Sequence, residues 1–198
     1  MMAQAGQDQL IGIVLAGGRS SRMGRDKAGL TWRSGQTFLD RAMAQLREVG
    51  CGSVIVSGKR PGHDCVPDRW PGQGPLGGMA SVLEARPALS GRLVIVPVDM
   101  PRLRSDSLRS LVAAARGDGA RYADVPLPMV LCLSDRLRSV VAVMMQSEAR
   151  SLRALARGLD MAVVEPTPAD ARANINTPAD LQRQAEDEME DRDEPRPL

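Results

Sequence analysis

The chain has 198 residues, a formal charge of +2, 43% apolar residues and 25% charged residues, which together indicate one globular domain. Aromatic residues make up only 2% of the chain, which argues against nucleic-acid-binding modules that stack bases on aromatic platforms. No apolar run approaches the roughly 18 residues of a transmembrane helix, so we expect no membrane span.

The first residues and the cysteines point to a reduced, cytoplasmic protein. The segment 1–9 is polar and lacks an apolar core, so we expect no secretory signal. The three cysteines are Cys51, Cys65 and Cys132, and none of them forms a CxxC pair. They therefore predict free thiols and neither a disulfide framework nor a zinc site.

Charge is distributed unevenly along the chain. Residues 186–198 hold seven acids and two bases, which leaves 24 bases and 17 acids in residues 1–185. The body therefore carries a charge of +7, which favours an anionic ligand, although an arginine-rich solvated surface would give the same balance. We expect residues 1–185 to form the domain and 186–198 to be a disordered acidic tail or a frayed helix end.

The hydrophobic pattern predicts an α/β fold. Apolar, β-branched runs typical of buried strands occur at 10–16, 53–57, 92–98, 129–133 and 161–165. Helical spacing and cap residues predict helices at 37–49, 77–85, 105–116, 134–146 and 179–188, and one that begins at 151. The Gly/Pro segment 58–75 is long enough to be functional or disordered. Strands that alternate with helices imply a mainly parallel sheet with right-handed crossovers.

The segment after the first strand, LAGGRSSRMGRDK (15–27), has the composition of an anion site. It lacks the G-x-G-x-x-G spacing of a dinucleotide site, and it is not a Walker A motif, because no glycine precedes Lys27. Gly17 and Gly18 would let the backbone approach a ligand closely. Arg19, Arg22, Arg25 and Lys27 concentrate positive charge that an anion would neutralise, although a flexible basic surface loop is the alternative.

Asp99 follows the apolar strand predicted at 92–98, which puts a carboxylate at the carboxyl end of a central strand. Ligands of open α/β sheets bind at this edge. Mg²⁺ takes one or two carboxylates together with phosphates and waters, so a bound Mg²⁺ would bring a triphosphate beside Lys27. The alternative is a helix-capping aspartate or one paired with an arginine.

Three further features carry weaker signals. The segment 74–78, GPLGG, predicts a turn into a helix whose N-terminal N–H groups favour anions, although a plain turn fits equally well. Asn174 and Asn176 flank one apolar residue and would share a face in an extended segment, where they bind a polar ligand or form Asx turns. His63 is the only histidine and is expected at the surface, which argues against a His-based triad or zinc site.

Four motifs together resemble a known enzyme family. In chain order they are LAGGRSSRMGRDKAGL (15–30), GPLGGMASVLEA (74–85), VPVDMP (96–101) and NINTPADL (174–181). The first resembles the L-x-G-G-x-x-x-R-M-G motif of nucleotidyltransferases, which include cytidylyltransferases and sugar-phosphate nucleotidyltransferases. The last motif, with Gly18 in the first, narrows the resemblance to the molybdenum cofactor guanylyltransferases.

The resemblance implies a single-domain, three-layer Rossmann-like nucleotidyltransferase fold with helices on both faces of the sheet. It also implies a Mg²⁺-dependent enzyme in which a phosphate of molybdopterin attacks the α-phosphate of GTP and pyrophosphate leaves. Since the nucleophile is already a phosphate oxygen, this chemistry requires no His or Cys base. GTP and molybdopterin are then the substrates, and other proteins of molybdenum cofactor biosynthesis or acceptor molybdoenzymes are candidate partners.

The resemblance also implies site residues at the matching positions. Those implied to contact the nucleotide are Leu15, Ala16, Gly17, Gly18, Arg22, Lys27, Asp68 and Asp99. Among them, Arg22 and Lys27 would hold the triphosphate, and Asp99 would hold Mg²⁺. Those implied on the pterin side are Asn174, Asn176 and Arg150.

Two positions depart from the family pattern. The stretch 125–129, VPLPM, is wholly apolar where the family often carries Arg, His or Gln, and Ser57 stands where many members have Asn. The first departure concerns acceptor recognition and the second a nucleotide contact. Two alternatives stay open: a related enzyme such as a molybdopterin cytidylyltransferase, and a nucleotide- or cofactor-binding protein without catalysis.

Overall fold

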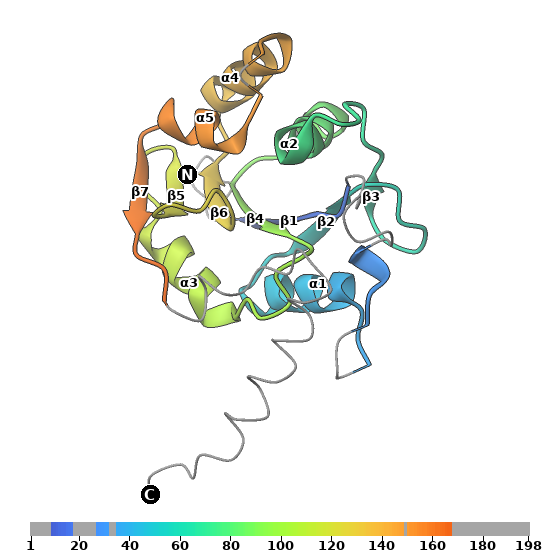
Figure 1. Ribbon diagram of the computed structural model, residues 1–198. Coiled ribbons are helices and arrows are strands. Elements are labelled where there is room, and N and C mark those ends of the chain that lie inside the picture. The colour runs from blue at the N-terminus through green and yellow to red at the C-terminus, as the bar shows by residue number, and fades with distance from the viewer. Residues whose placement is uncertain (1–8, 18–26, 32–34, 149, 168–198) are drawn as a thin grey trace, which may run out of the picture.

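The structure is a computed structural model that describes residues 9–17, 27–31, 35–148 and 150–167. A five-stranded sheet has the order β3-β2-β1-β4-β6, and all neighbours are parallel except β6, which is antiparallel to β4 (Figure 1). Its strands are β1 (Leu10–Leu15), β2 (Ser53–Ser57), β3 (Cys65–Val66), β4 (Arg92–Pro97) and β6 (Met129–Cys132). The α/β fold with a mainly parallel sheet is therefore confirmed.

Two more strands extend this architecture on the β6 side. β5 (Gly119–Tyr122) and β7 (Met161–Val164) form a parallel pair. The pair is joined to the sheet where the Cys132 N–H donates a hydrogen bond of 2.9 Å to the Asp118 carbonyl. The described helices are η1 (Lys27–Gly29, a 3₁₀ turn), α1 (Phe38–Glu48), α2 (Gly74–Ala85), α3 (Ser105–Ala114), α4 (Asp135–Gln146) and α5 (Leu152–Arg157).

Helices cover both faces of the sheet, as the predicted three-layer arrangement requires. Figure 1 shows α1 and α3 on one face and α2, α4 and α5 on the other. Because side chains alternate along a strand, Val14 of β1 packs in the core beneath α1, whereas Ile13 packs in the core beneath α2. A Cβ on Gly12 would lie 2.9 Å from Leu46 Cδ1, so the missing side chain lets α1 approach β1 closely.

The chain connections place a topological switch point at one edge of the sheet. β1 leads through α1 to β2 on one side, and β3 leads through α2 to β4 on the other side of β1. The carboxyl ends of β1 and β4 therefore lie side by side at a point where the strand order reverses. Ligands of open α/β sheets bind in the crevice at this position.

The structure corrects three details of the predicted elements. β3 and β5 were not predicted, because β3 has two residues inside a Gly/Pro segment and β5 contains a glycine and an arginine. α2 begins at Gly74, three residues before the predicted start at 77, so 74–78 forms the first part of the helix and not a turn before it. The segment 58–75 is neither disordered nor a plain loop, because it contains β3.

Two further findings concern the cysteines and the helices of the described residues. All three cysteines are free thiols. Among the described helices, none has the length and apolar character that crossing a membrane requires. The helix predicted at 179–188, the domain boundary at 185 and the acidic tail lie outside the described residues.

Candidate active site

The crevice at the switch point contains an ion pair between Lys27 and Asp99. Lys27 Nζ donates a hydrogen bond of 2.9 Å to Asp99 Oδ2, and the side chains are 16% and 21% exposed. Lys27 begins η1, and Asp99 follows β4 by two residues. The pair therefore joins the segment after β1 to the carboxyl end of β4.

Backbone contacts hold the end of β1 in place beside this pair. The Ala16 N–H donates to the Ser57 carbonyl at 3.0 Å, and the Val98 N–H donates to the Leu15 carbonyl at 3.2 Å. Arg60 Nη2 donates to the Ala16 carbonyl at 2.9 Å. Gly58 has a φ of +122°, and a Cβ there would lie 3.2 Å from the Gly17 nitrogen, so a glycine at 58 lets the two backbones touch.

A pocket of about 310 Å³ opens next to these contacts, between the ends of β1 and β2 and the start of α2. Its lining residues are Leu15, Gly17, Ser57, Asp68, Gly72, Gly74, Pro75 and Gly78. Small-molecule sites have volumes of about 300 Å³ and above. Four of the eight lining residues are glycines, so a ligand would meet mostly backbone along these walls.

Ser57 places a buried hydroxyl on the wall of this pocket. The residue has no exposed surface, and no group within the described residues forms a hydrogen bond with its Oγ. A Cβ on Gly78 would lie 2.6 Å from that Oγ, so the hydroxyl packs directly against the backbone of α2. A buried hydroxyl without a partner is costly, and a polar ligand in the pocket could supply the missing partner.

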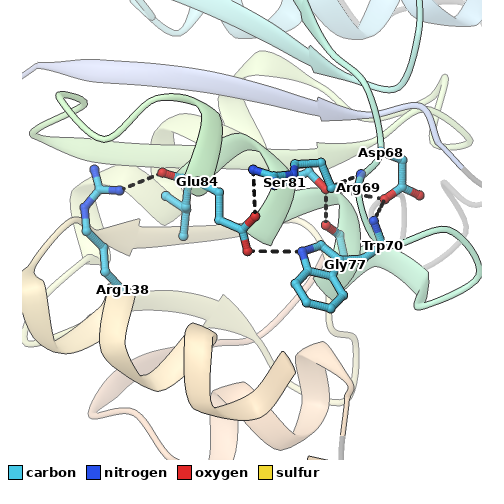
Figure 2. A network of polar contacts seen from close by, with 8 residues as sticks. Asp68, Arg69, Trp70, Gly77, Ser81, Glu84 and Arg138 are labelled. Atoms are coloured by element: carbon cyan, nitrogen blue, oxygen red, sulfur yellow. Dashed lines mark hydrogen bonds and ion pairs between the residues drawn. The ribbon is translucent and has the colours of Figure 1, made fainter. Parts of the chain in front are cut away.

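Asp68 is oriented by a network of polar contacts between the 67–70 segment and α2 (Figure 2). Its Oδ1 accepts a hydrogen bond of 2.9 Å from the Trp70 N–H and lies 3.4 Å from Ser81 Oγ. The Ser81 hydroxyl donates to the Gly77 carbonyl at 2.8 Å and accepts from the Arg69 N–H at 2.9 Å. These contacts hold Oδ1, while Oδ2 lies 3.9 Å from the position that a Cβ on Gly17 would take.

The N-terminus of α2 also faces the pocket. Gly74 and Pro75 line the pocket, and Gln73 at the N-cap forms no side-chain hydrogen bond to the helix. The first N–H groups of a helix have no partner within the helix, and the helix dipole favours negative charge there. The start of α2 therefore offers donors to a polar or anionic ligand.

The donor set suits a metal that shares its coordination with a substrate. Asp99 supplies a carboxylate oxygen, the type of ligand that Mg²⁺ and Mn²⁺ prefer. No cluster of three His, Cys, Asp or Glu side chains occurs in the part of the chain that the structure describes. The arrangement fits a cation held by one carboxylate, phosphates and waters.

The structure does not describe four of the predicted site residues, and it places a fifth, Arg150, away from the pocket. Gly18, Arg22, Asn174 and Asn176 lie outside the described residues. Arg150 is half-buried between α4 and α5, where its N–H donates to the Glu148 carbonyl at 2.9 Å, and it lines neither this pocket nor the second one described below.

His63 belongs to a turn, is half-buried and takes no part in the site. Its N–H donates to the Arg60 carbonyl at 3.3 Å. His63 is therefore less exposed than the surface position expected from the sequence.

Two residues that position the site were not predicted. Ser81 is a neutral residue within an apolar helix, and Arg60 lies in a Gly/Pro segment, so neither stands out in the sequence. Each is recognised only from its contacts, Ser81 with the Asp68 segment and Arg60 with the Ala16 carbonyl.

Comparisons with known proteins show which family this chain resembles. The model of the MobA-like NTP transferase domain matches residues 12–170. A molybdenum cofactor guanylyltransferase from Xanthomonas euvesicatoria pv. vesicatoria (strain 85-10) is 44% identical over 176 residues, which are 87% of this chain and 92% of that protein.

Solved structures share the fold at lower identity. Molybdopterin-guanine dinucleotide biosynthesis protein A from Archaeoglobus fulgidus superimposes with a TM-score of 0.72 at 18% identity, over 91% of this chain and 99% of that one. Rv0371C from Mycobacterium tuberculosis H37Rv, solved as a complex with manganese, gives a TM-score of 0.59 at 21% identity, over 90% and 98% of the two chains.

Proposed function

The chain belongs to the MobA-like NTP transferase family, with the molybdenum cofactor guanylyltransferases, and we propose that it transfers GMP from GTP to the phosphate of molybdopterin. A phosphate oxygen of the acceptor attacks the α-phosphorus of GTP. The bond from that phosphorus to the bridging oxygen breaks, and pyrophosphate leaves with the electron pair. The product is the guanine dinucleotide form of the molybdenum cofactor.

The observation that carries this proposal is the pocket of about 310 Å³ at the carboxyl ends of β1 and β2, on the same edge of the sheet as the Lys27–Asp99 pair. Such a transfer depends on in-line positioning and on stabilisation of phosphate charge. The guanosine would contact the backbone of Leu15, Ala16 and Gly17, whose glycine neighbours leave room for it. Asp68 and the Ser57 hydroxyl would bind polar groups of the nucleoside.

Charge in the crevice would be arranged around the triphosphate. Lys27 would leave Asp99 and bind phosphate oxygens, and Arg22 would assist it. Asp99 would hold Mg²⁺, which when bound supplies a Lewis acid that polarises the reacting phosphate. The manganese in the structurally similar mycobacterial protein supports a divalent cation at this type of fold.

On the acceptor side we propose the residues implied by the sequence motifs, Asn174, Asn176 and Arg150. We expect the reaction in the cytoplasm, where GTP is available and thiols such as Cys51 stay reduced. Proteins of molybdenum cofactor biosynthesis or acceptor molybdoenzymes are the partners we propose for delivery of the product.

The test is a transfer assay with Mg²⁺, molybdopterin and each of GTP, CTP and ATP. We expect pyrophosphate release and dinucleotide formation with GTP, and little with the other two. Transfer with CTP would instead indicate a molybdopterin cytidylyltransferase. Binding of GTP without transfer would indicate a binding protein that lacks catalysis.

A thermal-shift panel gives an independent check on the nucleotide. A ligand at 100 times its Kd stabilises the folded state by about 2.7 kcal/mol. For a chain of this size, that corresponds to a rise in Tm of roughly 5–10 °C. We expect that rise with GTP and Mg²⁺ and a smaller one with CTP.

A further inference from the structure

A second pocket lies at the carboxyl end of β5, between the segment that leads to β6 and the helix α5. Its volume is about 200 Å³. Three arginines line it: Arg121 from β5, and Arg153 and Arg157 from α5. The two helical arginines are four residues apart and therefore share one face of α5.

The positive charge of this pocket is only partly balanced by the chain. Arg121 Nη1 donates to the Tyr122 carbonyl at 3.1 Å, and Arg153 Nη2 donates to the Asp124 carbonyl at 3.3 Å. These carbonyl contacts orient the guanidinium groups without neutralising them. Within the described ranges, no carboxylate forms an ion pair with any of the three arginines, and Asp124 is the one acid that lines the pocket. With three arginines and one aspartate, the lining of the pocket carries a formal charge of +2.

This pocket opens toward the same edge of the sheet as Asp99. The segment 123–128 enters β6 at Met129, which pairs with Ile95 near the carboxyl end of β4. Asp99 follows Ile95 by four residues. A ligand that spans this edge could therefore reach from the Lys27–Asp99 crevice toward the three arginines.

The pocket also accounts for the apolar stretch 125–129. Val125 and Pro126 form part of its wall, with Ala156 of α5. The three arginines from β5 and α5 therefore place positive charge beside this apolar wall.

We infer that Arg121, Arg153 and Arg157 form a site for an anionic group of the acceptor substrate. This inference rests on the proposed function, since it assigns a role in binding the acceptor. Arginine favours oxyanions, because its planar guanidinium donates two parallel hydrogen bonds to them. The ligand group is therefore an oxyanion of the acceptor.

The test compares the unaltered protein with the double variant Arg153→Ala/Arg157→Ala and with Arg47→Ala. Arg153 and Arg157 are exposed and can be truncated without opening the core. Arg47 is a matched control, because it is an exposed arginine in the last turn of α1, on the opposite face of the sheet. Molybdopterin binding is measured by direct titration without nucleotide, and GTP binding by thermal shift.

We expect the double variant to bind molybdopterin at least tenfold more weakly, as loss of charged hydrogen bonds implies, with GTP binding unchanged. Arg47→Ala should match the unaltered protein in both. Arg157→Lys keeps the charge but loses the bidentate geometry, so it should weaken binding less than Arg157→Ala.

Unchanged molybdopterin affinity in the double variant, or an equal loss of GTP affinity, would overturn the inference. A titration with molybdate ion distinguishes the sources of the oxyanion. If molybdate binding is lost in the double variant while molybdopterin binding is retained, the pocket takes a free oxyanion and the assignment to the acceptor is wrong. If the transfer assay fails while the protein still binds molybdopterin, the proposed function is wrong, and the assignment of this pocket to molybdopterin is unaffected.

Discussion

Lys27 and Asp99 are 72 positions apart in the sequence and lie 2.9 Å apart in the fold, as a partly exposed ion pair at the switch point of the sheet. The pair links the group proposed to bind phosphate with the group proposed to bind the metal. In this pair, each side chain neutralises the charge of the other. Binding of a metal nucleotide would exchange this one ion pair for two new ones, from Lys27 to phosphate and from Asp99 to the cation.

Replacing Asp99 should separate function from stability. We expect Asp99→Ala to abolish transfer, while the free energy of unfolding falls by about 1 kcal/mol or less, because the pair is partly exposed to solvent. The transfer assay and a denaturant titration measure the two effects. Asp106→Ala is the control, since Asp106 also forms an ion pair, with Arg109 on α3, but lies away from the crevice. An Asp99→Ala protein that is unfolded would show that the carboxylate is structural.

Lys27→Met should change the affinities for nucleotide and for metal in opposite directions. We expect GTP to bind about tenfold more weakly or worse, because a charged hydrogen bond to phosphate is lost. Mn²⁺ without nucleotide should bind more tightly, since it no longer competes with the ammonium group for Asp99. Electron paramagnetic resonance of free Mn²⁺ measures the second effect. Lys59→Met removes an exposed lysine as a control, and weaker Mn²⁺ binding by Lys27→Met would contradict the exchange of partners.

Sequence patterns predicted most of the fold, because the central strands are unbroken apolar runs. β1, β2, β4, β6 and β7 lie within a residue or two of their predicted ranges. The start of α2 was missed because a proline and three glycines at 74–78 resemble a turn. In the structure, burial overrides these low helix propensities, since every residue from Leu76 to Leu83 is buried.

The site was predicted in part. Lys27 and Asp99 each carry a local signal, a basic loop and a carboxylate after a strand, and the rule that ligands bind at strand ends predicts their proximity. Their direct ion pair was not predicted. Ser81 and the arginines on β5 and α5 have no local signal. Their roles depend on which elements pack together, and a single sequence does not give this.

Ser81→Ala tests whether the network around Asp68 positions a nucleotide contact. We expect the KM for GTP to rise several-fold while kcat stays near its original value, because Asp68 Oδ1 loses a neighbour and Arg69 N–H loses its acceptor. The matched control is Ser110→Ala, since the Ser110 hydroxyl also donates to the carbonyl four residues earlier, but on the exposed surface of α3. A fall in kcat with KM unchanged would instead assign Ser81 to the chemical step.

Burial of Cys51 should make stability depend on alkaline pH. Burial raises the pKa of the Cys51 thiol from 9.0 to about 11. The unfolded chain therefore loses this proton first, so stability is fully present below pH 9 and is lost as the pH rises toward 11. The full loss is about 2–3 kcal/mol.

The measurement is urea unfolding across this pH range, compared with Cys51→Ala. The difference between the two proteins should shrink as the pH rises. The comparison with Cys51→Ala is needed because burial also raises the pKa of Cys132. Titration of Cys132 therefore lowers the stability of both proteins as the pH rises. A difference that stays constant from pH 8 to pH 10.5 would contradict a buried, protonated Cys51.

Gly78 and Ser57 should be coupled through the wall of the pocket. A Cβ at residue 78 would lie 2.6 Å from Ser57 Oγ, and Ser57 is fixed as the buried last residue of β2. Alanine has a higher helix propensity than glycine by about 1 kcal/mol, but overpacking of a rigid site costs about 1–3 kcal/mol. We therefore expect Gly78→Ala to lower the Tm and to weaken GTP binding.

Removing the serine hydroxyl should relieve that clash. In Ser57→Ala/Gly78→Ala the nearest remaining contacts of the new methyl group are Leu15 Cδ2 at 3.5 Å and the Cβ of residue 57 at 3.6 Å, which are ordinary van der Waals distances. The double variant should therefore be more stable than Gly78→Ala and at least as stable as Ser57→Ala, because the gain in helix propensity is no longer opposed. A double-mutant cycle of unfolding free energies measures this coupling, which should favour the pair by 1 kcal/mol or more. Additive effects would mean that α2 shifts away from β2 when a methyl group is added. GTP affinity tests whether the Ser57 hydroxyl also contacts the nucleotide. If it does, Ser57→Ala alone should keep its stability and bind GTP more weakly than the unaltered protein.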